Sequence, residues 1–121
     1  MRWEGTVGEY LQLLAAARAS GDGERVRRAL ARAELDGARR IEALDAAGAA
    51  ALDLATVLVT EAPVVLVDSP FDPPAGQRVL WHETLSEARR DGRTIVFSAG
   101  ADTDVPSIWD RLLTLDHGRV R

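Results

Sequence analysis

The sequence predicts an α/β fold in which helices come first and a parallel sheet follows. Two short apolar runs rich in β-branched residues, at 64–67 and 94–98, are typical of buried parallel strands. A stretch of helical periodicity separates the two runs, and further helical patterns fill the first 59 residues. This order indicates a β-α-β unit behind a helical front end.

The front end carries two predicted amphipathic helices. Thr6 followed by Glu9 forms a capping box, and apolar residues then recur at helical spacing as far as Ala17. A second helix is expected from about Glu24 to Leu35. Its solvent-exposed face is expected to carry three arginines, Arg25, Arg28 and Arg32.

Asp45 predicts the cap of a long Ala-rich helix that runs through Val59. The helix between the two strands is expected to turn four apolar side chains inward. These are Val79, Leu80, Leu85 and Ala88. Beyond the second strand, Asp104 predicts the start of a short helix to Asp110, and the last residues predict a hairpin whose first strand is Leu112–Leu115.

Composition excludes several classes of function. The chain has 121 residues with 15 basic and 19 acidic side chains, a net charge of −4, so nucleic acid is not an expected partner. Every basic residue is Arg, which excludes a phosphate-binding or Schiff-base lysine within these residues. The chain has no Cys and no apolar stretch long enough to span a bilayer, which fits a cytoplasmic protein.

The stretch Val64-Val65-Leu66-Val67-Asp68-Ser69-Pro70 places an acid at the end of a strand, where open α/β sheets bind ligands. It resembles the Walker B strand of ABC transporter ATPases, in which Asp-Glu-Pro follows four apolar residues. In that family the Asp holds magnesium and the Glu polarises the attacking water. Asp68 matches the magnesium-binding acid and Ser69 stands at the catalytic Glu position. A serine cannot act as a general base at neutral pH without a base beside it.

Five further segments resemble the same family in the same order. They are Thr6–Leu11 (entry to the helical subdomain), Leu52–Ala55 (the LDLA after the signature motif of drug-export-type members), Phe71–Pro73 (the D-loop, with Asp72), Gly92–Ser98 (the strand before the switch histidine) and residues 109–120 (the end of the core). The resemblance implies a truncated P-loop NTPase-like core. Residues 1–60 would be the helical-subdomain-like region and residues 61–121 the C-terminal half of the core, in one compact domain.

The resemblance also implies that nucleotide-contact positions are degenerate. The signature motif falls on Asp45, Ala46 and Ala47, where a carboxylate repels phosphate and methyl groups crowd the backbone. Gly100 stands at the switch-histidine position. ATP and Mg²⁺ belong to the parent family, whereas none is expected for the isolated chain, in which Asp68 is a vestigial magnesium site.

These features favour a non-hydrolysing accessory or interaction subunit of an ABC transporter, at the inner face of the membrane through a permease. Its expected partners are a permease or an ATPase subunit, with self-association or hetero-association. The alternative is half of a split ATPase that works only with a P-loop-bearing chain; a third hypothesis is a decaying fragment. Without the family's P-loop strand, the 112–115 segment pairs in its place, another chain supplies a strand, or an apolar edge stays exposed.

The residues offer two further candidate sites. Ser69 could be a nucleophile with His82 or His117 as its base, but ordinary surface histidines are favoured because no spacing brings either to Ser69. Asp102 and Asp104 could join Asp68 in a cation site, although a helix cap is favoured for Asp104.

Overall fold

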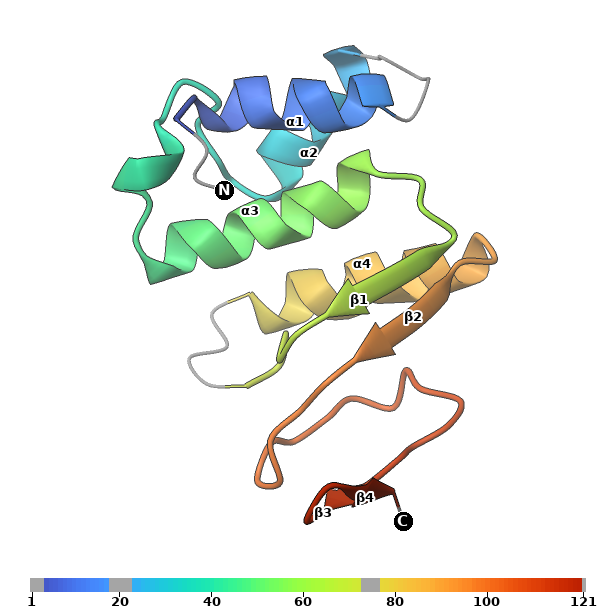
Figure 1. Cartoon of the computed structure of the whole chain (residues 1–121). Helices are drawn as coiled ribbons and strands as arrows, with labels where there is room; N and C mark the ends of the chain where they lie inside the picture. Colours follow the sequence, from blue (N-terminus) through green and yellow to red (C-terminus); the bar gives the residue numbers. More distant parts are fainter. Residues whose placement is uncertain (1–3, 18–22, 73–76, 121) are drawn as a thin grey trace.

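The computed structural model describes residues 4–17, 23–72 and 77–120 (Figure 1). Among these residues, three α-helices precede the first strand, and a fourth lies between the first two strands, as predicted. The helices are α1 (Val7–Ala17), α2 (Gly23–Arg32), a 3₁₀ turn (Ile41–Ala43), α3 (Ala46–Val59) and α4 (Arg78–Arg90). The strands are β1 (Val64–Val67), β2 (Thr94–Phe97), β3 (Leu115–Asp116) and β4 (Arg119–Val120).

The capping box at the start of α1 is confirmed. The Thr6 hydroxyl accepts from the Glu9 amide at 3.2 Å, and the Glu9 carboxylate accepts from the Thr6 amide at 3.0 Å. This hydrogen bond from the Thr6 backbone lowers the pKa of Glu9. Just inside the helix, the Gly8 amide donates to the Gly37 carbonyl at 2.9 Å, and a Cβ on Gly8 would lie 3.0 Å from that oxygen. Glycine at position 8 therefore lets the 36–39 turn sit against α1.

Helices α1, α2 and α3 pack around one apolar core, which continues beneath the sheet (Figure 1). The predicted cap of α3 is confirmed, because Asp45 Oδ1 accepts from the Gly48 amide at 2.8 Å. In α4 the inward set differs from the prediction at one position. Leu85 and Ala88 are buried as expected, but Val79 is 71% exposed, and Trp81 lies in the core instead.

Strands β1 and β2 pair in parallel, with Val64 opposite Thr94 and Val67 opposite Phe97. Helix α4 connects them, as the β-α-β prediction requires. Alternate side chains of both strands, Val65, Val67, Ile95 and Phe97, pack against the core. The Phe97 ring meets Phe71 edge-to-face at 5.4 Å, which fixes the turn after β1 on the same side of the sheet.

The expectation that both strands are buried holds for only one face of the sheet. Val64, Leu66 and Val96 point to the opposite face and are exposed. A continuous apolar run favours β structure, but it does not show whether a second layer covers the sheet, and the residues the structure describes supply none there.

The chain beyond β2 differs most from the sequence analysis. No helix spans 104–110, and the segment continues as a loop in which the Arg78 guanidinium donates to the Asp104 carbonyl. The terminal hairpin is confirmed, but its first strand is only Leu115–Asp116. Its turn residues, His117 and Gly118, have φ of 50° and 78°, as a two-residue type I′ turn requires.

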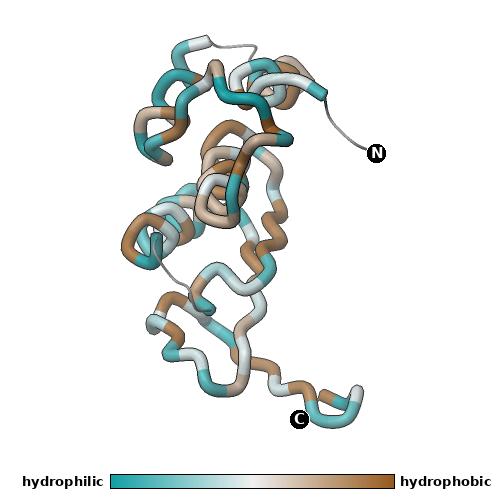
Figure 2. The backbone as a smooth tube through the Cα atoms, turned by 90° about the vertical axis from the view of Figure 1, so that its left-hand side faces the viewer, coloured by the Kyte–Doolittle hydropathy of each residue, from teal (hydrophilic) through white to brown (hydrophobic). Residues whose placement is uncertain are grey.

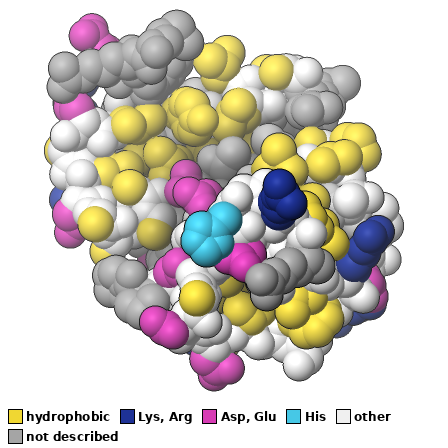
Figure 3. Space-filling model, turned by 60° about the horizontal axis from the view of Figure 1, so that its bottom comes forward, with side chains coloured by type: hydrophobic (Ala, Val, Ile, Leu, Met, Phe, Trp, Pro, Cys, Tyr) yellow, Lys and Arg dark blue, Asp and Glu magenta, His cyan; other side chains and the backbone are white. Residues whose placement is uncertain are grey.

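The hairpin pairs only with itself, so it does not take the place of a third strand beside β1 and β2. The apolar side chains of Leu112, Leu113, Leu115 and Val120 are exposed. Hydrophobic groups lie among acidic ones on this end of the molecule (Figure 3). Of the three outcomes foreseen for the sheet, pairing by the 112–115 segment is wrong. None of the described helices could cross a bilayer.

Replacement of the capping hydroxyl tests the α1 boundary. We expect Thr6→Ala to lower the free energy of unfolding by about 1 kcal/mol, because the Glu9 amide loses its acceptor. Urea unfolding followed by circular dichroism measures the change. Gln12→Ala, an exposed site in the same helix, is the control and should stay within about 0.5 kcal/mol of the parent chain. Equal effects of the two variants would contradict the capping role.

Candidate functional site

The carboxyl ends of β1 and β2 lie side by side, because the strands are parallel neighbours. Asp68 and Ser69 follow β1, and Ser98 follows β2. Ser98 Oγ donates to Asp68 Oδ1 at 2.6 Å, and the Ser69 hydroxyl donates to the same oxygen at 3.2 Å. The Ser69 amide donates to Ser98 Oγ at 2.9 Å. Asp68 therefore joins the two strand ends.

A second carboxylate binds the next loop. Asp72 Oδ1 accepts from Thr103 Oγ1 at 2.7 Å and from the Gly100 amide at 3.1 Å. The Thr103 hydroxyl is the largest cause that lowers the pKa of Asp72, followed by the Gly100 amide. We call the hydrogen bonds of Asp68 and Asp72 to the 98–103 segment the strand-end clasp. Sequence analysis did not identify Ser98 or Thr103 as its members, since neither belongs to a local motif.

Glycine at position 100 fits this clasp. A Cβ there would lie 3.2 Å from Asp72 Oδ2 and 3.4 Å from Thr103 Oγ1. A larger side chain, including the histidine that the resemblance implies for this position, would have to push against these two groups. Glycine, instead of the histidine that the resemblance implies, therefore leaves room at position 100 for the hydrogen bonds of Asp72.

The strand-end clasp contains no group of three metal ligands. Within residues 4–17, 23–72 and 77–120, no three His, Cys, Asp or Glu side chains are grouped so as to hold a metal, so Asp102 and Asp104 do not join Asp68 in such a site. Asp68 is exposed and offers one carboxylate, and Mg²⁺ held in this way takes its other ligands from waters and substrate phosphates. The Ser69 hydroxyl donates to Asp68 and lies 3.4 Å from the Ser98 hydroxyl. Neither of these partners is a histidine, so the contacts do not support Ser69 as a nucleophile activated by His82 or His117.

The residues at the signature-motif position lie at the start of α3. Asp45 caps the helix with its own carboxylate, and Ala46 and Ala47 are exposed on its first turn. A helix N-terminus attracts anions through its free amides. Here the Gly48 amide already donates to Asp45 at 2.8 Å, so a negative charge of the protein occupies this position. In Figure 1 this end of α3 lies on the same side of the molecule as the carboxyl end of β1.

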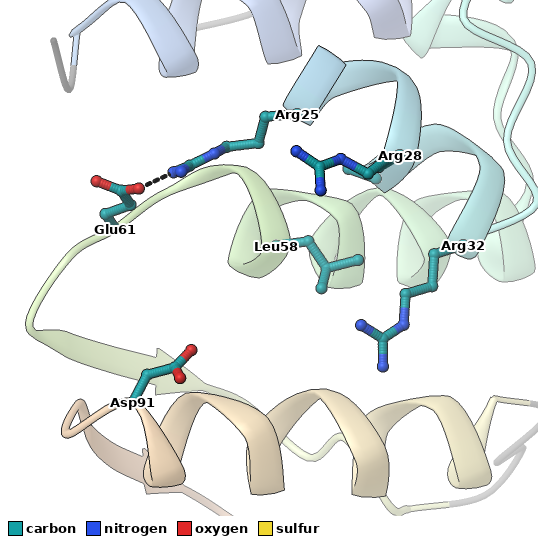
Figure 4. Close-up of a pocket in the computed structure, with 7 residues that line it drawn as sticks. Arg25, Arg28, Arg32, Leu58, Glu61 and Asp91 are labelled. Carbon is teal, nitrogen blue, oxygen red and sulfur yellow. Dashed lines mark ion pairs between the residues drawn. The ribbon is translucent and has the colours of Figure 1, made fainter. Parts of the chain in front are cut away.

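A charged groove, which sequence analysis did not foresee, lies between α2, the end of α3 and the turn after α4 (Figure 4). Its volume is about 300 Å³. We call it the α2 groove. It is lined by Arg25, Arg28, Ala29, Arg32, Leu58, Glu61 and Asp91.

Two of the three arginines in the α2 groove are paired across the fold. Arg25 forms an ion pair with Glu61, and Arg32 forms two hydrogen bonds to Glu87 at 2.8 and 2.9 Å. The Glu87 hydrogen bond raises the pKa of Arg32, and the same contact lowers the pKa of Glu87. The expectation of a simple solvated face is therefore wrong for Arg25 and Arg32, whose partners come from distant elements, whereas Arg28 lies beside Glu24 of its own helix.

Arg28 lies between these two pairs and differs from them. Its guanidinium Nε is 4.0 Å from Glu24 Oε1, at the outer limit for an ion pair, and its side chain is 70% exposed. Figure 4 shows it among the side chains that line the α2 groove. Arg28 is thus the cation here that a carboxylate from outside could reach without breaking a short ion pair.

A pH measurement tests the strand-end clasp. The folded pKa of Asp72 lies below its ordinary 3.8, so its stabilisation is complete above that value and is lost as pH falls through the folded pKa. We expect Asp72→Asn to lower the melting temperature at pH 7, and to lose less on acidification from about pH 5 to about pH 3 than the parent chain does.

Asp102→Asn, in the same loop, is the matched control for the loss of one carboxylate, and its acid-induced loss of melting temperature should equal that of the parent chain. An acid-induced loss of melting temperature in Asp72→Asn as large as that of the parent chain would contradict the contribution assigned to Asp72.

No family model matches the chain. The chain is 35% identical over 107 residues to the thiamine import ATP-binding protein ThiQ of Jannaschia sp. (strain CCS1). The match covers 84% of this chain and 46% of that protein, so the chain spans about half the length of the relative. The finer likeness to drug-export members stays a prediction. The similarity, together with a parallel sheet behind a helical front end, supports the ABC ATPase family for this chain.

Proposed function

We propose that this chain is a non-hydrolysing ABC ATPase-like protein that acts as an accessory or interaction subunit of an ABC transporter. One observation carries the proposal. The two acids that the resemblance assigns to magnesium and the D-loop, Asp68 and Asp72, are bonded to the chain's own 98–103 segment. A nucleotide would have to compete with these internal contacts.

Three positions that the resemblance assigns to nucleotide contacts also support the proposal. Ser69 stands where the resemblance requires a general base, Gly100 offers no side chain to a phosphate, and Asp45 presents a negative charge at α3. Each lost transition-state contact of this kind typically costs a few kcal/mol, so the three together should nearly abolish turnover. The described residues thus retain a framework but lack the groups that would act on a phosphate chain.

The first test is hydrolysis by the purified chain. We expect phosphate release from magnesium ATP to equal that of the buffer, and Asp68→Ala to give the same result, since no residue here replaces the catalytic base. A malachite-green assay measures it. Magnesium-dependent release that disappears with Asp68→Ala would contradict the proposal.

The split-ATPase alternative has one observation in its favour, because Asp68 is exposed where the resemblance places magnesium. The same assay with an added P-loop-bearing ABC polypeptide separates the two functions. Turnover that needs both chains and Asp68 would establish the alternative.

The α2 groove supports an interaction role. A partner segment that carries a carboxylate beside an apolar side chain could pair with Arg28 and cover Leu58. Pairing of this kind, excluded from water by surrounding contacts, gives an interface its specificity. We infer that a permease or ATPase subunit of the transporter docks here, and that the chain acts at the cytoplasmic side through this partner.

Charge reversal in the α2 groove tests the docking. We expect Arg28→Glu to weaken capture of the permease or ATPase components encoded beside the chain by about tenfold or more. Affinity pull-down with quantitative blotting measures it. Arg27→Glu makes the same charge change on the same helix outside the groove lining, and it should leave capture unchanged. Equal losses in both variants would place the partner elsewhere.

A further inference from the structure

A second cavity lies between α4 and the 104–110 loop, outside the α2 groove and the strand-end clasp. Its volume is about 480 Å³, which is within the usual range for a small-molecule site. We call it the α4 pocket. It is lined by His82, Ser86, Arg89, Arg90, Ser107 and Ile108. The first four of these residues belong to α4 and the last two to the loop, so both elements are needed to form the pocket.

Two arginines of α4 connect the helix to the 104–110 loop. Arg78 lies 3.7 Å from the Asp104 carboxylate, and Arg89 forms an ion pair with Asp110. The two arginines are about 16 Å apart along the helix axis, and an extended chain spans about 20 Å from residue 104 to residue 110. The loop is therefore long enough to follow the helix from one arginine to the other. Ile108, between the two contacts in sequence, packs against the core.

Helix α4 carries its acidic and basic side chains on different sides. Glu83 and Glu87 face α2, where their carboxylates lie 3.9 and 2.8 Å from the Arg32 guanidinium. The four α4 residues that line the pocket recur at spacings of three and four, which places them along another side of the helix. The acids of α4 that pair with α2 therefore do not neutralise the arginines of the α4 pocket.

The described lining of the α4 pocket is rich in hydrogen-bond donors. The two guanidiniums can only donate, and the two serine hydroxyls and the imidazole can also donate. No acidic side chain is among these described lining residues, and the neighbouring Asp110 accepts from Arg89. A phosphate group fits such a lining, because it carries a charge of about −1.5 to −2 and its oxygens accept from guanidinium and hydroxyl groups.

We propose that the α4 pocket binds a small organic phosphomonoester. Its phosphate group accepts from Arg90 and from the hydroxyls of Ser86 and Ser107, and its organic group lies against Ile108. A cavity of about 480 Å³ is much larger than a phosphate ion, so it has room for both parts of such a molecule. This binding uses neither the strand-end clasp nor the α2 groove, and it does not require the transporter role proposed above.

An NMR titration of the full 121-residue chain tests the proposal, with phenyl phosphate as the probe. We expect saturable shifts of the Ser86 and Ser107 amide resonances. Phenyl phosphate should bind more tightly than inorganic phosphate, because its ring covers Ile108. It should bind about tenfold more tightly than benzoate, whose carboxylate has one charge and two acceptor oxygens.

Three variants assign the site. Arg90→Gln should weaken binding of phenyl phosphate about tenfold, because one charge-assisted contact is lost. Ser107→Ala should weaken it as well, although every arginine stays in place. Arg119→Gln removes the same charge from the terminal hairpin, which extends away from the helices in Figure 2, and it should bind like the parent chain. All three side chains are exposed, so the variants should fold, which circular dichroism checks.

Four outcomes would overturn the proposal. The first is no saturable shift in the folded parent chain. The second is a set of shifts that disappears with Arg28→Gln, which would place the phosphate in the α2 groove. The third is equal weakening in Arg90→Gln and Arg119→Gln. The fourth is an affinity for benzoate or inorganic phosphate equal to that for phenyl phosphate, which would show attraction of anions without recognition of a phosphomonoester.

Discussion

The parallel pairing of β1 with β2 is the constraint on which the rest of the structure depends. Parallel strands need a crossover, and α4 supplies it on the core side. The same pairing brings Asp68 and Ser98 together at the carboxyl ends, 30 residues apart in the sequence. It also leaves Leu66 and Val96 on a face without a second layer. The candidate site and the apolar surface are thus two consequences of one pair of strands.

The strand-end clasp explains why glycine fits at position 100. Asp72 accepts from the Gly100 amide at 3.1 Å, and a side chain at position 100 would crowd the Asp72 carboxylate. Thr103 then supplies the second donor. In place of groups aimed outward at a ligand, the loop after β2 turns its donors back onto the protein. This internal satisfaction of charge is why the proposed role is binding to proteins rather than phosphate chemistry.

Most of the structural features that the sequence predicted correctly depend on residues close together in the chain. The Thr6–Glu9 capping box, the Asp45 cap and the two apolar strands depend on residues close in the chain. Long-range features were missed for the same reason. Arg32 meets Glu87 across 55 residues, and nothing local to α2 indicates a groove instead of a solvated face. Nor could the sequence show that the 104–110 segment is a loop, in which Arg78 donates to the Asp104 carbonyl from 26 residues away.

The α2 groove also depends on the sheet, through Arg93. This guanidinium, whose pKa is lowered by burial, donates to the Ala62 carbonyl at 2.8 Å and to the Val57 carbonyl at 3.3 Å. It therefore ties the start of β2 to the end of α3 and the approach to β1. Glu61 and Asp91, which line the groove, flank these tied segments in sequence. Because Arg93 connects the β1–β2 pair to the segments beside Glu61 and Asp91, the shape of the α2 groove depends on the pairing of these two strands.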